Sequence, residues 1–363
     1  MKIFFYSQVI WDDVWQRPQE FAINASKKVK ITYFSPISLH RYVKVYRKIG
    51  VKLYKKINEN LEVFSPIISP GYYRNPLIKK FNDFYLKYKV FKILKNDNYT
   101  HFFTNSPFIW TILKDINIPV IYDIIDDFVK FSWAPKGADK EEIFLFQKAK
   151  LCFTGTYTLY ERKNVYHKNI HFIPCGVNFE KFYKPIGSVP QDIKKIPKPI
   201  IGYYGTISDR LNKEIIKMLS KEIPEANIVL IGPVQSSFGE IIKASNIHYL
   251  GLKPHDELPL YLKYFDVCIL PFNLDEGTKS INPVKLLEYL SGGKIVISTP
   301  IPDIVRFYSD IVFIENSVTL FVKRVKEQLN NPDISRIKKG IEFAKNKSWI
   351  AMTNRMLEMM KDI

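Results

Sequence analysis

Short apolar runs of strand length recur along this chain and alternate with segments long enough to form a helix. They lie at residues 2–7, 29–35, 61–65, 100–105, 119–125, 150–154 and 169–174, and again at 199–205, 227–232, 247–251, 266–271, 294–299 and 311–314. Nearly continuous apolar strands are typical of sheets that are covered on both faces. Because strands and helices alternate, the pattern predicts an α/β fold of doubly wound parallel sheets.

The length of the chain and one proline-rich stretch predict two domains. A chain of 363 residues is too long for one ordinary hydrophobic core. Residues 185–198, with Pro199 directly after them, contain four prolines and no apolar periodicity, which is typical of a linker. We therefore expect two Rossmann-like domains, at 1–184 and 199–333, that face each other across a ligand-binding cleft. A helical segment at 334–363 is expected to pack back on the first domain.

Composition excludes several classes of protein. An apolar content of 46% is too high for a disordered chain, and no apolar run reaches the length of a membrane span. The first residues have a strand pattern and not that of a signal peptide. Cys152, Cys175 and Cys268 lie in apolar, strand-like contexts without metal-ligand spacing, so we expect buried free thiols and a cytoplasmic location.

The net charge of +18 is concentrated in the first half of the chain. Residues 1–184 hold 30 basic against 16 acidic residues, and residues 41–95 hold 14 against 3, a net charge of +11. Such a field attracts phosphate-rich surfaces, either anionic lipid or nucleic acid. The alternative is that lysines only solvate exposed faces. The basic region contains no recognisable nucleic-acid-binding motif, so nucleic acid is not the expected partner.

Residues 282–294, with the sequence NPVKLLEYLSGGK, combine a helix start, two charged side chains and a Gly-Gly stop. Asn282 is suited to the N-cap of a helix, and Pro283 to its first helical position. The free backbone N–H groups at such a helix start form an anion site. Lys285 and Glu288 share one helical face and offer a cation for phosphate and a carboxylate for sugar hydroxyls. The combination suits a nucleotide diphosphate sugar; the alternative is an ordinary capped helix.

The chain also resembles a known family. Its second half, from residues 201–205 through 282–289, is similar to the donor domain of GT-B glycosyltransferases, and more narrowly to glycosyltransferase family 4 and the bacterial teichuronic-acid-biosynthesis type. In the first half the resemblance is carried by residues 15–19, 122–128 and 174–178. It implies a nucleotide-sugar donor in the second domain, an acceptor in the first, and retaining, metal-independent transfer without a cofactor.

The resemblance places the donor on particular residues. Glu288 is expected on the ribose hydroxyls, and the loop that contains Leu252 near the base. The diphosphate is expected to lie near Gly205, Thr206, Arg210, Asn282, Pro283, Val284 and Lys285. The family often has a second Glu eight residues before Glu288; here that position is Ser280, so either its hydroxyl or Glu276 is expected to replace the carboxylate. Arg210 has the alternative role of an exposed side chain in a strand-to-helix turn.

Acceptor contacts are expected from two loops of the first domain. Trp15 or Trp11 is suited to stack on a sugar ring, and Arg17 to hold a phosphate. Asp123, Asp126 and Asp127 crowd one loop, where they contact the acceptor or cap a helix. Asp126 is the candidate base for an inverting reaction, and a retaining reaction needs none. The catalytic candidates are thus Arg210, Lys285, Glu288 and Asp126, and no metal site is expected.

Residues 76–95 place apolar and basic side chains at helical spacing. The apolar ones are Leu77, Ile78, Phe81, Phe84, Tyr85, Tyr88, Phe91 and Leu94, with lysines around them. We favour a core helix with a lysine-rich outer face over a helix that lies on an anionic membrane.

These observations predict a hexosyltransferase-type enzyme that moves a sugar from a nucleotide diphosphate sugar to a cell-surface polysaccharide or lipid-linked glycan. We expect the enzyme in the cytoplasm, either free or bound peripherally at the inner face of the plasma membrane. The alternatives are a nucleotide-sugar epimerase on the same scaffold and a non-catalytic, basic membrane-binding homologue.

Overall fold

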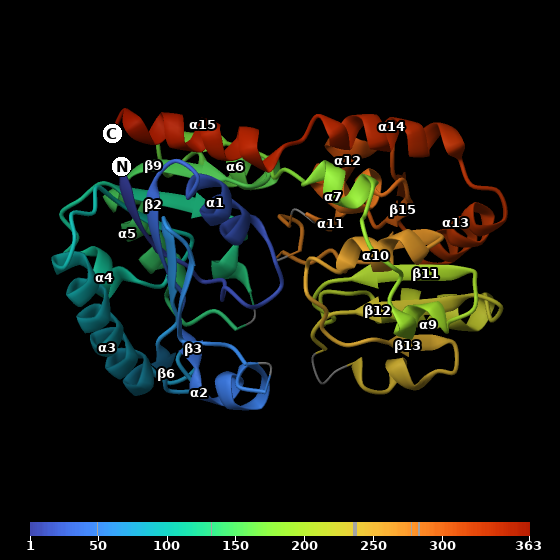
Figure 1. Ribbon diagram of the computed structural model, residues 1–363, viewed down its shortest axis with the longest axis horizontal. Coiled ribbons are helices and arrows are strands. Elements are labelled where there is room, and N and C mark those ends of the chain that lie inside the picture. The colour runs from blue at the N-terminus through green and yellow to red at the C-terminus, as the bar shows by residue number, and fades with distance from the viewer. Residues whose placement is uncertain (49, 132, 235–237, 277, 282–283) are drawn as a thin grey trace. The chain divides into compact units, whose positions relative to one another are not determined.

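The computed structural model describes residues 1–363 except 49, 132, 235–237, 277 and 282–283. The chain forms two compact units, the first of residues 1–174 with 349–363 and the second of residues 175–348 (Figure 1). Each unit has its own sheet and its own hydrophobic core.

The first unit is built on an eight-stranded sheet with the order β10-β9-β8-β7-β1-β2-β5-β4. Its strands are β1 (Lys2–Tyr6), β2 (Lys30–Phe34), β4 (Tyr54–Asn58), β5 (Leu61–Phe64), β7 (His101–Thr104), β8 (Val120–Ile124), β9 (Ala149–Thr154) and β10 (Ile170–Phe172), and β3 (Ile37–Ser38) pairs separately with β6 (Ile67–Ile68). All neighbours are parallel except β4 and β5.

Helices of the first unit cover this sheet. They are α1 (Arg17–Ala25), α2 (Leu39–Arg41), η1 (Tyr42–Tyr46), α3 (Pro76–Lys95), α4 (Trp110–Leu113), η2 (Phe128–Lys130), α5 (Ala138–Lys148), α6 (Tyr157–Lys163) and α15 (Trp349–Lys361). The chain's last helix, α15, packs against α1 (Figure 1). It is fixed there by a hydrogen bond of 2.9 Å between His101 Nε2 and the carbonyl of Met360.

The second unit contains a six-stranded, fully parallel sheet with the order β13-β12-β11-β14-β15-β16. Its strands are β11 (Ile200–Tyr204), β12 (Asn227–Ile231), β13 (Ile247–Tyr249), β14 (Val267–Leu270), β15 (Ile295–Ser298) and β16 (Phe313–Ile314). The order runs outward from β11 in both directions, as in a doubly wound sheet. This confirms the predicted α/β class with parallel sheets.

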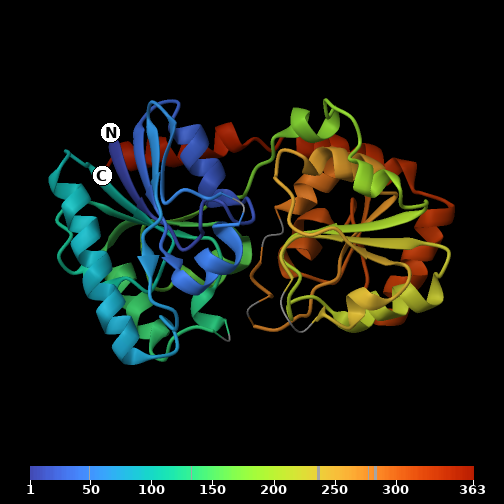
Figure 2. The same ribbon diagram turned by 60° about the horizontal axis from the view of Figure 1, so that its bottom comes forward.

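Helices lie on both faces of the second sheet (Figure 2). They are α7 (Phe179–Tyr183), α8 (Gln191–Lys194), α9 (Lys213–Glu222), η4 (Ile241–Lys243), α10 (Leu258–Tyr264), α11 (Lys285–Ser291), α12 (Pro302–Tyr308), α13 (Val318–Asn330) and α14 (Ile334–Lys345). Helices α9 and α13 pack together, and α11 packs with α7 and α14. No helix among the residues described combines the length and the apolar character that a membrane span requires.

The chain passes from one unit to the other at two positions, after Pro174 and after Ser348. The sequence instead placed boundaries at 184, 198 and 333. Residues 175–198 lie with the second unit because the N–H of Val177 donates to the carbonyl of Lys347 at 2.9 Å and because α7 and α8 pack on α10. The segment 334–363 is divided: α14 packs on α11 of the second unit, whereas α15 completes the first.

Candidate functional site

Two glycine turns meet at the carboxyl ends of β11 and β12. Gly205 and Gly232 follow these strands with φ of +134° and +133°, backbone that favours glycine. The N–H of Gly205 donates to the carbonyl of Ile231 at 2.8 Å, and that of Gly232 to the carbonyl of Gly251 at 2.8 Å. A Cβ at Gly232 would lie 2.1 Å from the Gly205 carbonyl oxygen, so the two turns approach too closely for any side chain.

Lys285, the first residue of α11, extends over the turn at Gly205. A Cβ at Gly205 would lie 2.7 Å from Lys285 Cε and 3.0 Å from its Nζ. The ammonium group lies 5.5 Å from the ring centroid of Tyr203 and 5.6 Å from that of Phe272. Cation–π attraction therefore holds this positive charge at the end of β11. The structure thus brings together two predicted donor residues, Gly205 and Lys285, that are 80 positions apart in the sequence.

Arg210 belongs to the same end of the sheet. Its carbonyl accepts a hydrogen bond of 2.8 Å from the N–H of Asn273, which ties the loop after β11 to the loop after β14. Burial raises the pKa of the Tyr203 phenol, and the nearby charge of Arg210 opposes this rise. Lys285 and Arg210 therefore both place positive charge close to Tyr203.

Glu288 lies one helical turn after Lys285 and is 5% exposed. Its Oε1 accepts a hydrogen bond of 2.8 Å from His255 Nε2. Burial alone would raise the pKa of this carboxyl group, but the hydrogen bond and charge of His255, the Tyr204 phenol and the Lys285 charge together lower it below its ordinary value. Glu288 is consequently ionised at neutral pH and is suited to accept hydrogen bonds from hydroxyl groups.

His255 is a site residue that the sequence analysis did not single out. Its Nε2 lies 2.8 Å from Glu288 Oε1, and because an ionised carboxylate can only accept, Nε2 carries the proton of this hydrogen bond. The sequence analysis treated this loop as backbone that lies near a base. No motif connects His255 with Glu288, since only the meeting of the loop after β13 with α11 brings them together.

The remaining donor candidates differ in what the structure describes. Asn282 and Pro283 lie outside the described residues, and α11 begins at Lys285 with Val284 at its N-cap position. The Thr206 carbonyl accepts a hydrogen bond of 3.2 Å from the Tyr203 hydroxyl. The backbone of Thr206 therefore lies beside Tyr203, the ring that Lys285 contacts. Leu252, in the loop after β13, is 38% exposed.

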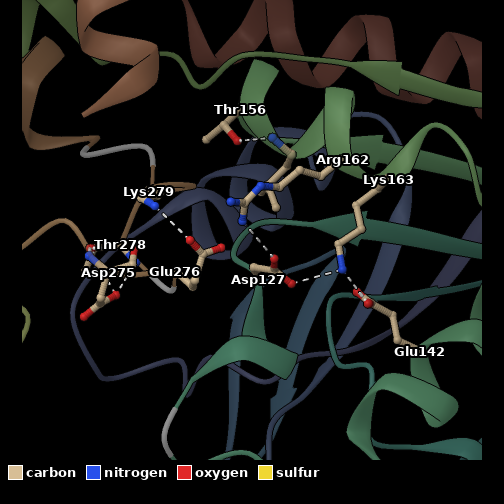
Figure 3. A network of polar contacts seen from close by, with 10 residues as sticks. Asp127, Glu142, Thr156, Arg162, Lys163, Asp275, Glu276, Thr278 and Lys279 are labelled. Carbon is tan, nitrogen blue, oxygen red and sulfur yellow. Dashed lines mark hydrogen bonds and ion pairs between the residues drawn. The ribbon is translucent and has the colours of Figure 1, made fainter. Parts of the chain in front are cut away.

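Ser280 and Glu276 were the alternatives for the second carboxylate. Ser280 is buried, whereas Glu276 is exposed and accepts a hydrogen bond of 2.8 Å from Lys279 Nζ (Figure 3). The loop between them is held by Thr278, whose N–H donates to Asp275 Oδ1 at 2.9 Å. Which of the two side chains contacts a sugar stays a prediction.

In the first unit, Arg17 and Asp123 form an ion pair inside the core, with exposed side-chain fractions of only 2% and 0%. Arg17 Nη2 lies 2.8 Å from Asp123 Oδ1 and Nε lies 2.9 Å from Oδ2, while Nη1 donates to the carbonyl of Ile173 at 2.6 Å. The sequence analysis expected both side chains to face an acceptor. The structure places them instead between α1, β8 and β10, because the first residue of α1 lies directly over the sheet.

Asp127 belongs to a second buried network (Figure 3). Lys163 Nζ lies 3.0 Å from Asp127 and 2.5 Å from Glu142, and the Tyr122 hydroxyl donates to Glu142 at 2.9 Å. Burial raises the pKa of Glu142 in spite of the opposing Lys163 charge. Asp127 therefore balances an internal lysine, a role that neither the acceptor interpretation nor the capping interpretation predicted.

Trp15 and Asp126 are less enclosed than these ion pairs. Trp15 is half-buried, donates through Nε1 to Glu20 Oε1 at 2.8 Å and packs against the ring of Trp11 with 5.4 Å between centroids. Asp126 is half-buried, unlike Asp123 and Asp127. Of the five predicted acceptor residues, these two are the ones that the structure leaves accessible in part.

The chain is similar to known glycosyltransferases in sequence and in fold. Residues 198–331 match the family model described as "Glycosyl transferases group 1". A stretch of 154 residues is 26% identical to the Bacillus subtilis (strain 168) protein named "Putative teichuronic acid biosynthesis glycosyltransferase TuaH". This stretch covers 40% of the present chain and only 38% of that relative's length.

Solved structures match over the whole chain. Sucrose-phosphate synthase from Thermosynechococcus elongatus superposes with a TM-score of 0.77 at 14% identity and covers 100% of this chain and 99% of its own. Anabaena Alr3699/HepE in complex with UDP-glucose gives a TM-score of 0.74 at 12% identity, with 100% of both chains covered. At these identities the likeness shows a shared fold, which is the GT-B fold that the sequence predicted.

Proposed function

We propose that this chain is a glycosyltransferase that uses a nucleoside diphosphate sugar as its donor, because residues 198–331 match the glycosyl transferases group 1 family model. The observation that carries the proposal is the pairing on α11 of Lys285, held at the end of β11, with the ionised Glu288 one turn later. One residue offers a cation for a diphosphate and the other an acceptor for hydroxyl groups.

The proposed chemistry is stabilisation of a departing nucleoside diphosphate. Negative charge grows on the diphosphate as the bond to the sugar breaks, and preorganised cations lower the energy of that transition state. Lys285 and Arg210 would supply this charge at the end of β11, close to the glycine turn at Gly205. Glu288 would bind the ribose hydroxyls in the orientation that His255 fixes.

Uridine diphosphate sugars are the first donors to test. The solved structures with the same fold include Anabaena Alr3699/HepE in complex with UDP-glucose and an E. coli protein bound with UDP-2-fluoro glucose. The loop after β13, which contains Leu252, would contact the base.

We further propose a polysaccharide or lipid-linked glycan as the acceptor, bound by the first unit and met at the inner face of the membrane. The name of the Bacillus subtilis relative, which refers to teichuronic acid biosynthesis, supports a polymer of the cell envelope. Trp15 and Asp126 would contact the acceptor, since they are only half-buried. We propose metal-independent transfer because Lys285 and Arg210 would supply the positive charge for the diphosphate, and retaining transfer because the family resemblance implies it.

A thermal-shift panel of uridine, guanosine and adenosine diphosphates and their sugars tests the donor. A nucleotide that binds only the folded protein raises the melting temperature, by an amount that grows with concentration above Kd. We expect a shift with one nucleotide family, and its loss in Glu288→Ala. The absence of a shift with every nucleotide would overturn the proposal. Glu214→Ala, on the exposed surface of α9, is the matched control and should keep the shift.

A further inference from the structure

Helix α3 exposes large apolar side chains on the face turned away from its sheet. Leu77, Phe81, Phe84 and Tyr88 are 77%, 64%, 77% and 58% exposed. Their spacing of four, three and four residues places them along one line of the helix, over roughly 16 Å at 1.5 Å per residue. We call these four residues the outer stripe. Their helical spacing predicted core positions, and their exposure overturns that prediction.

The outer stripe is not needed to hold α3 in place. The opposite face of the helix buries Leu86 and Val90 in the core of the first unit. Asn82, also buried, exchanges two hydrogen bonds with the backbone of Ser69, at 3.0 and 3.1 Å. The helix start is capped by Asn75, whose side chain accepts from the N–H groups of Leu77 and Ile78. Substitution of the outer stripe should therefore leave the fold intact.

Five of the six lysines of α3 divide into two groups, and the sixth, Lys89, is half-buried beside the ring of Tyr85. On the side of the sheet, Lys79 lies 2.9 Å from Asp83 and 3.1 Å from Glu141, and Lys87 pairs with Asp115. Beside the outer stripe and at the end of the helix, three further lysines are exposed and have no ion-pair partner within the part of the chain that the structure describes: Lys80, Lys92 and Lys95.

The outer face of α3 is positively charged, and no exposed acidic side chain of the helix balances this charge. Asp83 is the only acidic residue of α3, and it is buried. Residues 41–95 as a whole carry a net charge of +11. An aromatic stripe with lysines around it and without exposed carboxylates complements a surface that is apolar inside and anionic outside.

We propose that the outer stripe, with Lys80, Lys92 and Lys95, is a docking surface for an anionic lipid bilayer. The rings of Phe81 and Phe84 enter the boundary between headgroups and acyl chains, while the lysine ammonium groups extend to the lipid phosphates. A second copy of the chain is a poorer occupant, because two identical basic faces repel each other. Nucleic acid would leave the Leu and Phe side chains in water. The proposal does not depend on sugar transfer.

Co-sedimentation of the full chain with vesicles tests the docking surface. The wild-type protein should bind phosphatidylcholine vesicles that contain phosphatidylglycerol, bind pure phosphatidylcholine weakly, and lose affinity as salt rises. Phe81→Gln/Phe84→Gln should weaken binding by about tenfold or more. Lys80→Gln/Lys92→Gln/Lys95→Gln should weaken it by about fivefold per lysine at low salt.

Matched controls separate docking from damage to the fold. Val165→Gln removes an apolar side chain of the same unit that is as exposed as Phe84, and Lys221→Gln/Lys326→Gln/Lys339→Gln removes the same charge from exposed positions of the second unit. Both controls should bind vesicles as the wild type does. Every variant should keep the melting temperature of the wild type, a control that needs no nucleotide, so failure of the donor proposal would not affect this result.

Three outcomes would overturn the proposal. The first is equal binding to neutral and anionic vesicles, and the second is vesicle binding that the Phe81→Gln/Phe84→Gln variant retains in full. The third is a wild-type protein that ignores vesicles but forms a dimer, or binds single-stranded RNA, in a way that the outer stripe variant abolishes. In that case the occupant is a second copy or a nucleic acid.

Discussion

The charged side chains that lie near strand ends have different surroundings in the two units. In the first unit, Arg17 and Asp123 neutralise each other inside the core, and Asp127 balances Lys163. In the second unit, Glu288 is held ionised by a histidine, and Lys285 rests on two aromatic rings at the carboxyl end of β11. The difference shows that charged residues near strand ends support the fold in one unit and are arranged for a ligand in the other.

Among the substitutions that test this comparison, Arg17→Met should have the largest effect on stability. Removal of one partner leaves the buried Asp123 carboxylate without compensation, which costs about 3–5 kcal/mol of stability. We expect the amides of α1 and β8 to lose much of their protection in hydrogen exchange, whereas β11 and β12 keep theirs. Arg17→Met/Asp123→Leu should recover part of the loss, because no charge then stays buried. Unchanged protection in the single variant would mean that the pair is not structural.

Lys285→Ala should leave the fold intact and reduce turnover. If its ammonium stabilises the departing diphosphate, kcat falls by about 10²- to 10³-fold, the range for loss of one preorganised group. The measurement is steady-state transfer with the donor found by thermal shift. Lys217→Ala, on exposed α9, is the control and should keep wild-type kcat. A rise in KM with unchanged kcat would assign Lys285 to ground-state binding alone.

His255→Ala should have the smallest effect and the clearest pH signature. The ordinary pKa of 4.5 for a glutamate is lowered in Glu288, so donor binding by the wild type should persist as pH falls and fail only below that value. Without His255 the burial of Glu288 dominates and raises its pKa. Donor binding should then fail at higher pH and be weaker by about tenfold at neutral pH, the cost of one hydrogen bond to a charged group.

The pH titration of donor affinity for both proteins checks this prediction. His255→Gln, whose side-chain amide can still donate, should restore part of the binding and move the titration back toward lower pH. Identical pH profiles for the wild type and His255→Ala would show that His255 does not control the ionisation of Glu288.

Much of this arrangement could be predicted from the sequence. The alternation of apolar strands and helices gave the parallel α/β class, and residues 201–205 with 282–289 gave the family resemblance that the match over 198–331 confirms. These features depend on local patterns, because the periodicity that predicts a strand or a helix involves residues that are close together in the sequence. The roles assigned to Lys285 and Glu288 stay predictions, although the structure places both at the end of the second sheet.

Other features depend on contacts between distant residues, and only the tertiary structure decided them. Arg17 and Asp123 are 106 positions apart, and His255 and Glu288 are 33 apart, so no local pattern shows either pair. The apolar residues of α3 fit a helix equally well with either face inward, and packing against the sheet chose the face of Leu86 and Val90. The sequence by itself determined the elements and the chemistry available at their ends. The fold determined which charges neutralise each other inside the core and which remain for a ligand, because a buried charge is tolerated only when a partner compensates its desolvation.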